Sequence, residues 1–188
     1  MALAENQLKI RNGFGWGFMS SLTNCSKLFL LEIGANRLTG ELPDSVGNLS
    51  TNMKYFITNH NSITGRIPEG IGNLVNLQFV EMNNNLFEGP IPDSFGRLKK
   101  LNQLYLSGNK FSGSIPSSIG NLQMLNVLAL FDNKLSGEIP PSLGNCPLQQ
   151  LDISYNNLTG SIPKELFSST LSGSLHLDHN FFNWDSTA

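Results

Sequence analysis

The sequence predicts an α/β repeat protein, a solenoid in which each unit of about 24 residues adds one strand to a parallel sheet. Three observations lead to this fold class. An asparagine recurs at intervals of 23 to 25 residues, two apolar residues separated by a single residue precede it, and a Gly-x-Ile-Pro or Gly-x-Leu-Pro segment usually follows it. The recurring asparagines are Asn36, Asn61, Asn85, Asn109, Asn133, Asn156 and Asn180. This repeat overrides the one or two ordinary domains that 188 residues would otherwise suggest.

The apolar pair lies five and three positions before each asparagine, and its period of two is that of a strand with one buried face. Strands are therefore expected to centre on Leu31, Phe56, Val80, Leu104, Leu128, Leu151 and Leu175. A single unit has too little apolar surface to fold alone, so neighbouring units must stack over a shared core. In the second unit the polar Thr58 occupies an inward position, which predicts a locally weaker coil.

The recurring asparagines and the glycines that follow them are expected to be structural. An asparagine side chain carries both donors and an acceptor, so it can pair with backbone groups that the turn after the strand would leave unpaired. The glycine four residues later suits a turn with unusual dihedral angles, and the proline after it fixes φ where no ladder donor is wanted. We call the seven asparagine side chains the asparagine ladder.

The segment Asn133-Lys-Leu-Ser-Gly-Glu-Ile-Pro-Pro-Ser-Leu-Gly-Asn145 resembles the plant-specific leucine-rich repeat. Six consecutive Gly-x-Ile/Leu-Pro cores carry the resemblance along the chain from Leu22 to Asn180. It implies a right-handed leucine-rich-repeat solenoid with a concave parallel β-sheet and a convex side of 3₁₀ turns and irregular segments. The expected organisation is a partial, elongated irregular repeat at 1–21, a solenoid of about seven units at 22–183 and a non-repeat tail at 184–188.

The stretch Trp16–Leu28 narrows the resemblance to an ectodomain fragment of the leucine-rich-repeat receptor-like serine/threonine kinases. It is similar to an irregular, longer repeat in the subfamily that includes plant sensors of bacterial elicitors. The resemblance implies a segment on the extracellular face of the plasma membrane that binds a peptide or protein ligand and a co-receptor, in pathogen perception or other signalling. The kinase domain of such receptors is absent from this chain, so no enzymatic activity and no cofactor are expected.

Two other interpretations stay open. A kinase-less receptor-like protein, or a secreted binder similar to the inhibitors of pathogen polygalacturonases, would use the same scaffold. The other is a truncated product without a function of its own, because the chain enters in mid-repeat at Leu3-x-x-Asn6-x-Leu8 and the last repeat stops after Asn180. Terminal capping repeats normally cover the open core of a solenoid, and none is recognisable in the sequence.

The composition argues against two classes of partner. The net charge is −2, and the 12 basic and 14 acidic residues are scattered, so the chain offers no cationic stripe for nucleic acid or anionic lipid. The longest apolar run is about four residues, against the roughly 20 that cross a bilayer, so no membrane insertion is expected.

The first eight residues lack the basic start, apolar centre and cleavage site of a secretory signal, which favours an internal fragment.

A glycine-rich segment and a cluster of His and Asp residues could indicate a nucleotide-binding loop and a metal site, but both are interpreted as structural. Gly13-Phe-Gly-Trp-Gly17 lacks the flanking strand, helix and distant acidic residue of a nucleotide loop, so Trp16 and Phe18 are expected to pack, as part of a loop, over an elongated coil. His176, Asp178 and His179 cluster on the last strand, but a metal site needs three or four ligands with supporting contacts. Solvated charges are favoured there, and no metal or catalytic site is predicted.

Cys25 and Cys146 both occupy the position held elsewhere by Leu49 and its equivalents, so each is expected to be a reduced, buried core residue. They lie five coils apart, about 24 Å, which exceeds the ~7 Å Cα separation of a disulfide.

Sequons make Asn24, Asn48 and Asn157 candidate N-glycosylation sites, although chance alone would give about as many in this composition.

Strand alternation defines the predicted binding face, because the residues beside and between the inward apolar residues point outward. The candidate ligand-binding residues on this concave face are Tyr55, Ile57, Asn59, Phe79, Glu81, Tyr105, Val127, Phe131 and Asp132. They form an apolar and aromatic region with a polar rim, which is the usual mark of an interaction site. The alternative is that Tyr55, Phe79 and Val127 are apolar for strand packing alone.

Overall fold

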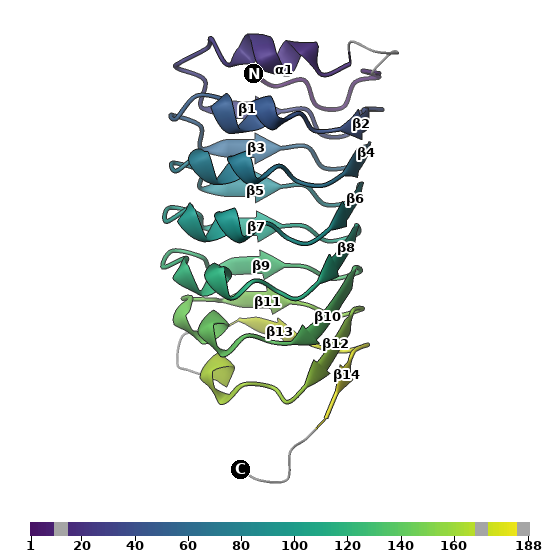
Figure 1. The fold of residues 1–188 in the computed structure, drawn as a ribbon, viewed down its shortest axis with the longest axis vertical. Coiled ribbons are helices and arrows are strands. Elements are labelled where there is room, and N and C mark those ends of the chain that lie inside the picture. The colour runs from purple at the N-terminus through teal and green to yellow at the C-terminus, as the bar shows by residue number, and fades with distance from the viewer. Residues whose placement is uncertain (10–14, 168–172, 184–188) are drawn as a thin grey trace.

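The computed structural model describes residues 1–9, 15–167 and 173–183, and these form a stack of coils (Figure 1). One parallel sheet runs along the stack in the order β1-β3-β5-β7-β9-β11-β13. Its strands are β1 (Leu30–Glu32), β3 (Tyr55–Ile57), β5 (Phe79–Glu81), β7 (Gln103–Tyr105), β9 (Val127–Ala129), β11 (Gln150–Asp152) and β13 (Ser174–His176). The central residue of every strand is the one predicted, and the strand register aligns these residues in one row, so this prediction is confirmed.

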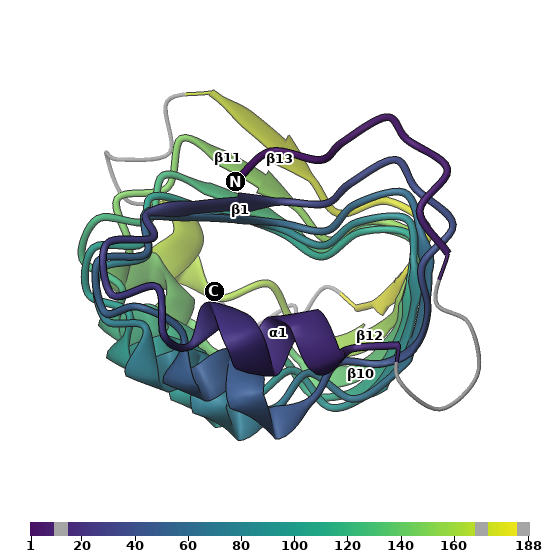
Figure 2. The same ribbon diagram turned by 90° about the horizontal axis from the view of Figure 1, so that it is seen from above.

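A second parallel sheet, which the sequence analysis did not predict, lies beyond the turn at the asparagine ladder (Figure 2). It runs in the order β14-β12-β10-β8-β6-β4-β2. Its strands are β2 (Thr39–Glu41), β4 (Ser62–Gly65), β6 (Leu86–Gly89), β8 (Lys110–Gly113), β10 (Lys134–Glu138), β12 (Asn157–Gly160) and β14 (Phe181–Phe182). The repeat glycines within it have φ between +73° and +78°, a backbone conformation that residues with a Cβ rarely adopt. The repeat glycine is the last residue of β4, β6, β8 and β12 and the residue before the last in β2 and β10, so it lies where the chain turns toward the convex side.

The convex side consists of 3₁₀ helices, as the resemblance implied. They are η1 (Asp44–Asn48), η2 (Glu69–Asn73), η3 (Asp93–Arg97), η4 (Ser117–Asn121), η5 (Pro141–Asn145) and η6 (Lys164–Phe167). The first five follow a proline in an extended conformation, which fixes the direction of entry. A second glycine within each of the first five sets the coil spacing: a Cβ at Gly120 would lie 2.3 Å from the Ser142 carbonyl oxygen of the next coil. Backbones therefore touch where any larger residue would force the coils apart.

The first coil carries an α-helix, α1 (Gly17–Leu22), beside η1. The aromatic residues expected in a loop there lie at the helix start: Trp16 stacks on Phe18 with ring centroids 5.7 Å apart, and both pack against the core. The Trp16 indole Nε1 donates to the Thr39 carbonyl at 3.2 Å. Packing over the coil is thus correct, the loop assignment is wrong from Gly17 onward, and Gly13 and Phe14 lie outside the described residues.

One side chain of the asparagine ladder illustrates how coils are joined. The Asn109 Nδ2 contacts the carbonyls of Leu106 at 3.0 Å and Ser107 at 3.1 Å in its own coil, and that of Met82 in the preceding coil at 3.1 Å. Its Oδ1 accepts from the Phe87 amide, also in the preceding coil, at 3.0 Å. The same four contacts recur, at equivalent positions, at Asn36, Asn61, Asn85, Asn133 and Asn156. Asn180 repeats the pattern toward Ile153 and Leu158. Each side chain therefore closes its own turn and binds it to the one before.

The inward residues form one continuous apolar core along the stack. Thr58 interrupts it: its side chain is fully buried, and its hydroxyl has no hydrogen-bond partner among the described residues. A buried hydroxyl without a partner loses its hydrogen bonds to water and gains none in return.

Among the described residues, the helices are all too short or too polar to span a bilayer.

The two cysteines differ, although the repeat pattern gave them one position. Cys146 is 2% exposed, its thiol donates to the Ile119 carbonyl at 3.2 Å, and burial raises its pKa to about 11. Cys25 is exposed, so the prediction that both are buried is wrong for Cys25. It follows α1, and residues 1–9 pair only with the strand side of this coil, through Ala2 to Glu32 and Lys9 to Arg37. No described coil therefore covers the thiol on that side.

Replacing Thr58 with valine is expected to raise the free energy of unfolding by about 1 kcal/mol, because valine keeps the shape and removes the unpaired hydroxyl. Chemical denaturation of both proteins measures the difference. Thr51→Val, at an exposed position, is the control and should change stability by less than about 0.5 kcal/mol. A Thr58→Val protein no more stable than the wild type would contradict the prediction.

In the native protein a thiol reagent is expected to label Cys25 rapidly and Cys146 only on unfolding, because only the exposed thiol is accessible and the buried one stays protonated. Mass spectrometry of the labelled peptides separates the two sites. Equal labelling rates in the native state would show that Cys146 is accessible.

Candidate functional site

The outward residues of the β1 to β13 sheet form the concave face in rows across the coils. One row contains Leu30, Tyr55, Phe79, Gln103, Val127 and Gln150, and the next contains Glu32, Ile57, Glu81, Tyr105, Ala129 and Asp152. All of these residues lie on strands that have a parallel neighbour, so their spacing is set by backbone hydrogen bonds. The face is therefore a rigid platform.

Three rings on adjacent coils form an aromatic ladder, which we define as Tyr55, Phe79 and Tyr105. The ring centroids of Tyr55 and Phe79 are 6.4 Å apart, and those of Phe79 and Tyr105 are 5.6 Å apart. Tyr55 is 37% exposed, and the other two are half-buried. A shallow depression of about 570 Å³ opens beside the ladder, lined by Tyr55, Gln78, Phe79, Lys100, Asn102, Gln103 and Met124. Aromatic rings that the protein's own chain leaves half open are common anchors of binding energy.

The remaining predicted apolar residues do not extend the stack of rings, although Ile57 shares β3 with Tyr55. Phe131 is 41% exposed, but its ring does not stack on the ladder in the described structure. Ala129, which is 8% exposed, is the register neighbour of Tyr105 on the adjoining strand, and Val127 beside Gln103 is half-buried. The predicted region therefore consists of the ladder and a separate Phe131, with small side chains between them.

Glu81 lies on the concave face between Ile57 and Tyr105 in the register. Its Oε1 accepts a hydrogen bond from the Asn59 Nδ2 at 3.0 Å. Partial burial raises the pKa of the Glu81 carboxyl; nearby His60 opposes this shift and Glu32 adds to it. Asn59 and Glu81 are both predicted candidate residues, but their hydrogen bond could not be predicted from the sequence.

The hydroxyl of Tyr105 donates to the Gln103 Oε1 at 3.0 Å, which holds the ring along its own strand. Burial, and secondarily the charge of Glu81, raises the pKa of Tyr105. The phenol therefore stays neutral, and the Glu81 carboxylate is the charged group at this point of the face. The predicted candidate Asp132 and the equivalent residue His60 are both exposed and adopt positive φ immediately before an asparagine of the ladder.

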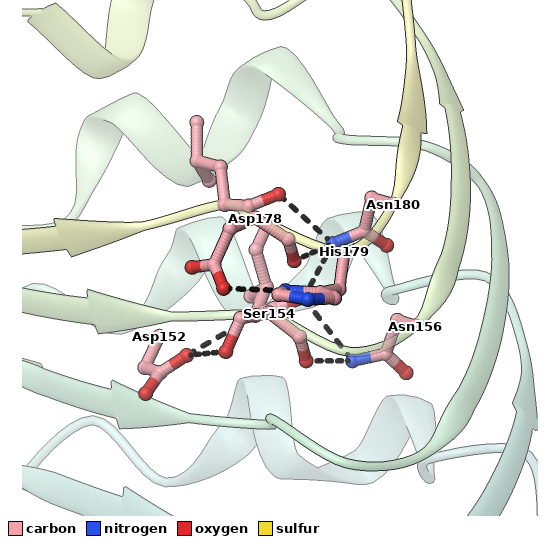
Figure 3. A network of polar contacts seen from close by, with 8 residues as sticks. Asp152, Ser154, Asn156, Asp178, His179 and Asn180 are labelled. Atoms are coloured by element: carbon pink, nitrogen blue, oxygen red, sulfur yellow. Dashed lines mark hydrogen bonds and ion pairs between the residues drawn. The ribbon is translucent and has the colours of Figure 1, made fainter.

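A polar network occupies the concave face near the last strands (Figure 3). Asp152 Oδ1 accepts from the Ser154 amide at 3.1 Å and from its hydroxyl at 2.6 Å. The His179 Nδ1 lies 2.7 Å from the Asp178 Oδ2, and this hydrogen bond lowers the pKa of Asp178. The ring of His179 stacks on Tyr155 at a centroid distance of 3.9 Å. Among the described residues no three His, Cys, Asp or Glu side chains are placed to hold a metal ion.

The three sequon asparagines are all exposed. Asn24 follows α1 and Asn48 ends η1, so both lie on the convex side, and Asn157 begins β12 of the second sheet. None of the three lies on the strands of the concave face.

Comparisons with known proteins agree on the repeat. The family model "Leucine-rich repeat region" matches residues 14–177. Receptor kinase-like protein Xa21 of Oryza sativa subsp. japonica is 48% identical over 76 residues, which is 40% of this chain and 7% of Xa21.

Two solved structures resemble almost the whole chain. A crystal structure of PEPR1–AtPEP1 superposes with a TM-score of 0.86 at 36% identity, covering 97% of this chain and 25% of that one. The Arabidopsis receptor kinase HAESA, in complex with the peptide hormone IDA and the co-receptor SERK1, gives a TM-score of 0.85 at 36% identity, with 97% and 30% covered. This chain thus spans less than a third of each of these proteins, within the leucine-rich-repeat part, and no kinase domain is matched.

Glu81→Gln is expected to raise the thermal midpoint at pH 7 and to leave it unchanged near pH 3, below the ordinary pKa of 4.5. The sign follows from the raised pKa: the folded protein binds this proton more tightly than the unfolded chain. Glu81 therefore lowers stability as the pH rises through the ordinary pKa to the raised one, and the loss persists above it. Glutamine is never charged and avoids this loss.

Calorimetry at both pH values measures the effect. Glu88→Gln, on an exposed position of the second sheet, makes the same change in net charge and serves as the matched control. An equal rise in both variants would assign the effect to net charge, and a lower midpoint in Glu81→Gln at pH 7 would show that the carboxylate stabilises the fold.

Proposed function

The chain belongs to the leucine-rich-repeat family, and on this premise we propose that it is part of the extracellular, ligand-binding ectodomain of a plant receptor-like kinase. Its concave face binds a peptide or a protein segment, and a co-receptor is a second partner of the assembled receptor. The resemblance to receptor ectodomains over 97% of the chain supports the first step, and the HAESA complex with a peptide hormone and a co-receptor supports the second.

The observation that carries the proposal is the aromatic ladder. Tyr55, Phe79 and Tyr105 lie on three hydrogen-bonded strands, and each ring remains half open. Aromatic pairs on neighbouring strands stabilise a sheet, but an apolar group of rings that stays half open on the outward face also marks an interaction site. Because the strands fix the rings before a ligand arrives, little conformational entropy is lost on binding.

More specifically, we propose that the receptor perceives a pathogen. It is supported by the similarity of Trp16–Leu28 to the irregular repeat of the subfamily that includes sensors of bacterial elicitors. A kinase-less receptor-like protein would carry the same binding face, so binding alone does not separate it from a receptor-like kinase. A truncated product without function would bind no ligand, and binding by the 188-residue chain therefore separates it from both.

We also propose that Asn24, Asn48 and Asn157 carry N-glycans in the secreted protein. Their exposure outside the concave sheet supports this, because bulky glycans at these positions leave the face above the strands accessible.

Tyr105→Ala and Phe131→Ala are each expected to weaken binding of a concave-face peptide by about 1 to 2 kcal/mol, because each removes an exposed aromatic contact. Peptides are selected from a random display library against the purified chain, and isothermal calorimetry gives the dissociation constants. Both variants should keep the thermal midpoint of the wild type.

Phe167→Ala, which removes a 59% exposed aromatic ring from η6 on the convex side, is the control and should bind as tightly as the wild type. If only Phe167→Ala loses affinity, the binding site is on the convex side. Failure of the library to yield any peptide that competes at the concave face would reject the proposed function.

A further inference from the structure

We propose that the concave face contains a subsite for the guanidinium group of an arginine in the ligand, formed by the Glu81 carboxylate and the rings of Phe79 and Tyr105. This inference rests on the proposed function, since it names one residue that the bound peptide must present. It adds a charge requirement that the aromatic ladder alone does not impose.

One oxygen of the Glu81 carboxylate accepts a hydrogen bond, and no cationic side chain of the described residues forms an ion pair with the carboxylate. Asn59 donates to Oε1, and within the described chain no Lys, Arg or His nitrogen lies within 4.0 Å of either carboxylate oxygen. Partial burial disfavours the charged carboxylate, as its raised pKa indicates. A cation from a partner would supply the missing counter-charge, and it would meet a carboxylate already held in place.

Two aromatic rings flank this carboxylate. Phe79 precedes Glu81 by two residues on β5 and shares its face, and Tyr105 is the register partner of Glu81 on β7. The two rings form a tilted pair with centroids 5.6 Å apart and an interplanar angle of 48°, and both rings are half-buried, so part of each stays open to a ligand. A guanidinium within about 6 Å of a ring centroid is attracted to the ring face, and its planar shape allows it to stack while donating to a carboxylate.

The coils that contain Glu81 and Tyr105 each carry one polar side-chain atom without a hydrogen-bond partner among the described residues. Asn83 Oδ1, two residues beyond Glu81, and the Ser107 hydroxyl, two residues beyond Tyr105, are buried and have no hydrogen-bond partner among the described residues. Ser107 is only 2% exposed, although it is on the outward side of its strand. Buried polar atoms are usually paired, so these two atoms, two residues after Glu81 and Tyr105, are polar groups whose hydrogen bonds the described protein leaves unmade.

A glycine in the first coil positions the carboxylate. Asn59 reaches back over Gly34, and a Cβ at Gly34 would lie 2.0 Å from the Asn59 Oδ1. The φ of Gly34 is not in the left-handed region, so its glycine is required by this space and not by the backbone conformation. Gly34 thus leaves room for the Asn59 side chain, which donates to Glu81 in the next coil, and it is a positioning residue for the subsite.

The charges near the subsite also favour a cation. Glu32 on β1 adds negative potential, and the exposed His60 is the basic side chain that opposes the rise in the pKa of Glu81. Lys100, at the edge of the depression, has its Nζ 2.6 Å from the Asn76 Oδ1. A single carboxylate with amide and hydroxyl neighbours provides too few charged oxygens for a divalent metal, which prefers several.

Nuclear magnetic resonance titration of the 188-residue chain with N-acetyl-L-arginine amide tests the subsite directly. N-acetyl-L-citrulline amide has nearly the same shape without the charge and is the matched ligand. We expect saturable shift changes in β3, β5 and β7 with the arginine compound, and at least tenfold weaker binding of the citrulline compound. Glu81→Gln should reduce arginine binding at least tenfold, whereas Glu88→Gln, with the same charge change on the second sheet, should leave it unchanged.

Gly34→Ala tests the positioning of the carboxylate without touching the subsite itself. It should weaken arginine binding by at least threefold and leave citrulline binding and the thermal midpoint unchanged, so that discrimination between the two ligands falls. Gly17→Ala is the control, because a Cβ there meets no atom within 4 Å. Equal discrimination in Gly34→Ala and the wild type would remove Gly34 and Asn59 from the site.

The subsite proposal fails if the two ligands bind equally, if the shifts fall outside the concave face, or if Glu88→Gln weakens binding as much as Glu81→Gln. Library peptides that bind the concave face and depend on Tyr105 would uphold the proposed function even then. If no library peptide binds while N-acetyl-L-arginine amide still distinguishes Glu81 from Glu88, the proposed function fails and the cation site stands.

Discussion

The hydrogen bonding of the asparagine ladder is the constraint on which the rest of the molecule depends. A coil of about 24 residues must turn sharply after its concave strand, and this turn leaves backbone groups that neither sheet can pair. One amide side chain pairs them in its own coil and also contacts the coil before. Stability is therefore a sum of contacts between neighbours, and the strands, glycine turns and 3₁₀ helices are placed by that repeated junction.

Much of the scaffold was predictable from the sequence because it depends on periodicity. The centres of all seven concave strands follow from the apolar pair and the asparagine after it. The second sheet was missed because its short strands contain glycines with positive φ, which argue against a strand when taken singly, and only pairing between coils makes them strands. Cys25 was misplaced because the repeat gives a position its usual environment, whereas burial also requires a neighbouring coil on each side.

The candidate site was predictable only as a set of positions. Alternation along the strands puts Tyr55, Phe79, Glu81 and Tyr105 on one face, but it cannot say that three rings approach one another while Phe131 lies apart. The hydrogen bond from Asn59 to Glu81 depends on side-chain torsions and on the space above Gly34, in the coil before Asn59. Such contacts depend on neighbouring coils jointly, and no single repeat contains the information.

The fixed coil spacing has a consequence for the length of any bound peptide. Neighbouring strands lie about 4.8 Å apart, whereas side chains on one face of an extended peptide recur about every 6.7 Å. Two peptide intervals, about 13 Å, come within about 1 Å of three strand intervals, about 14 Å, and three peptide intervals, about 20 Å, come within about 1 Å of four strand intervals, about 19 Å. A single peptide interval differs from a single strand interval by about 2 Å, so side chains next to an aligned position fall between the rows. A peptide lying along the solenoid axis can therefore place side chains squarely on the rows at two separated points, and the residues between them contribute mainly by holding that distance.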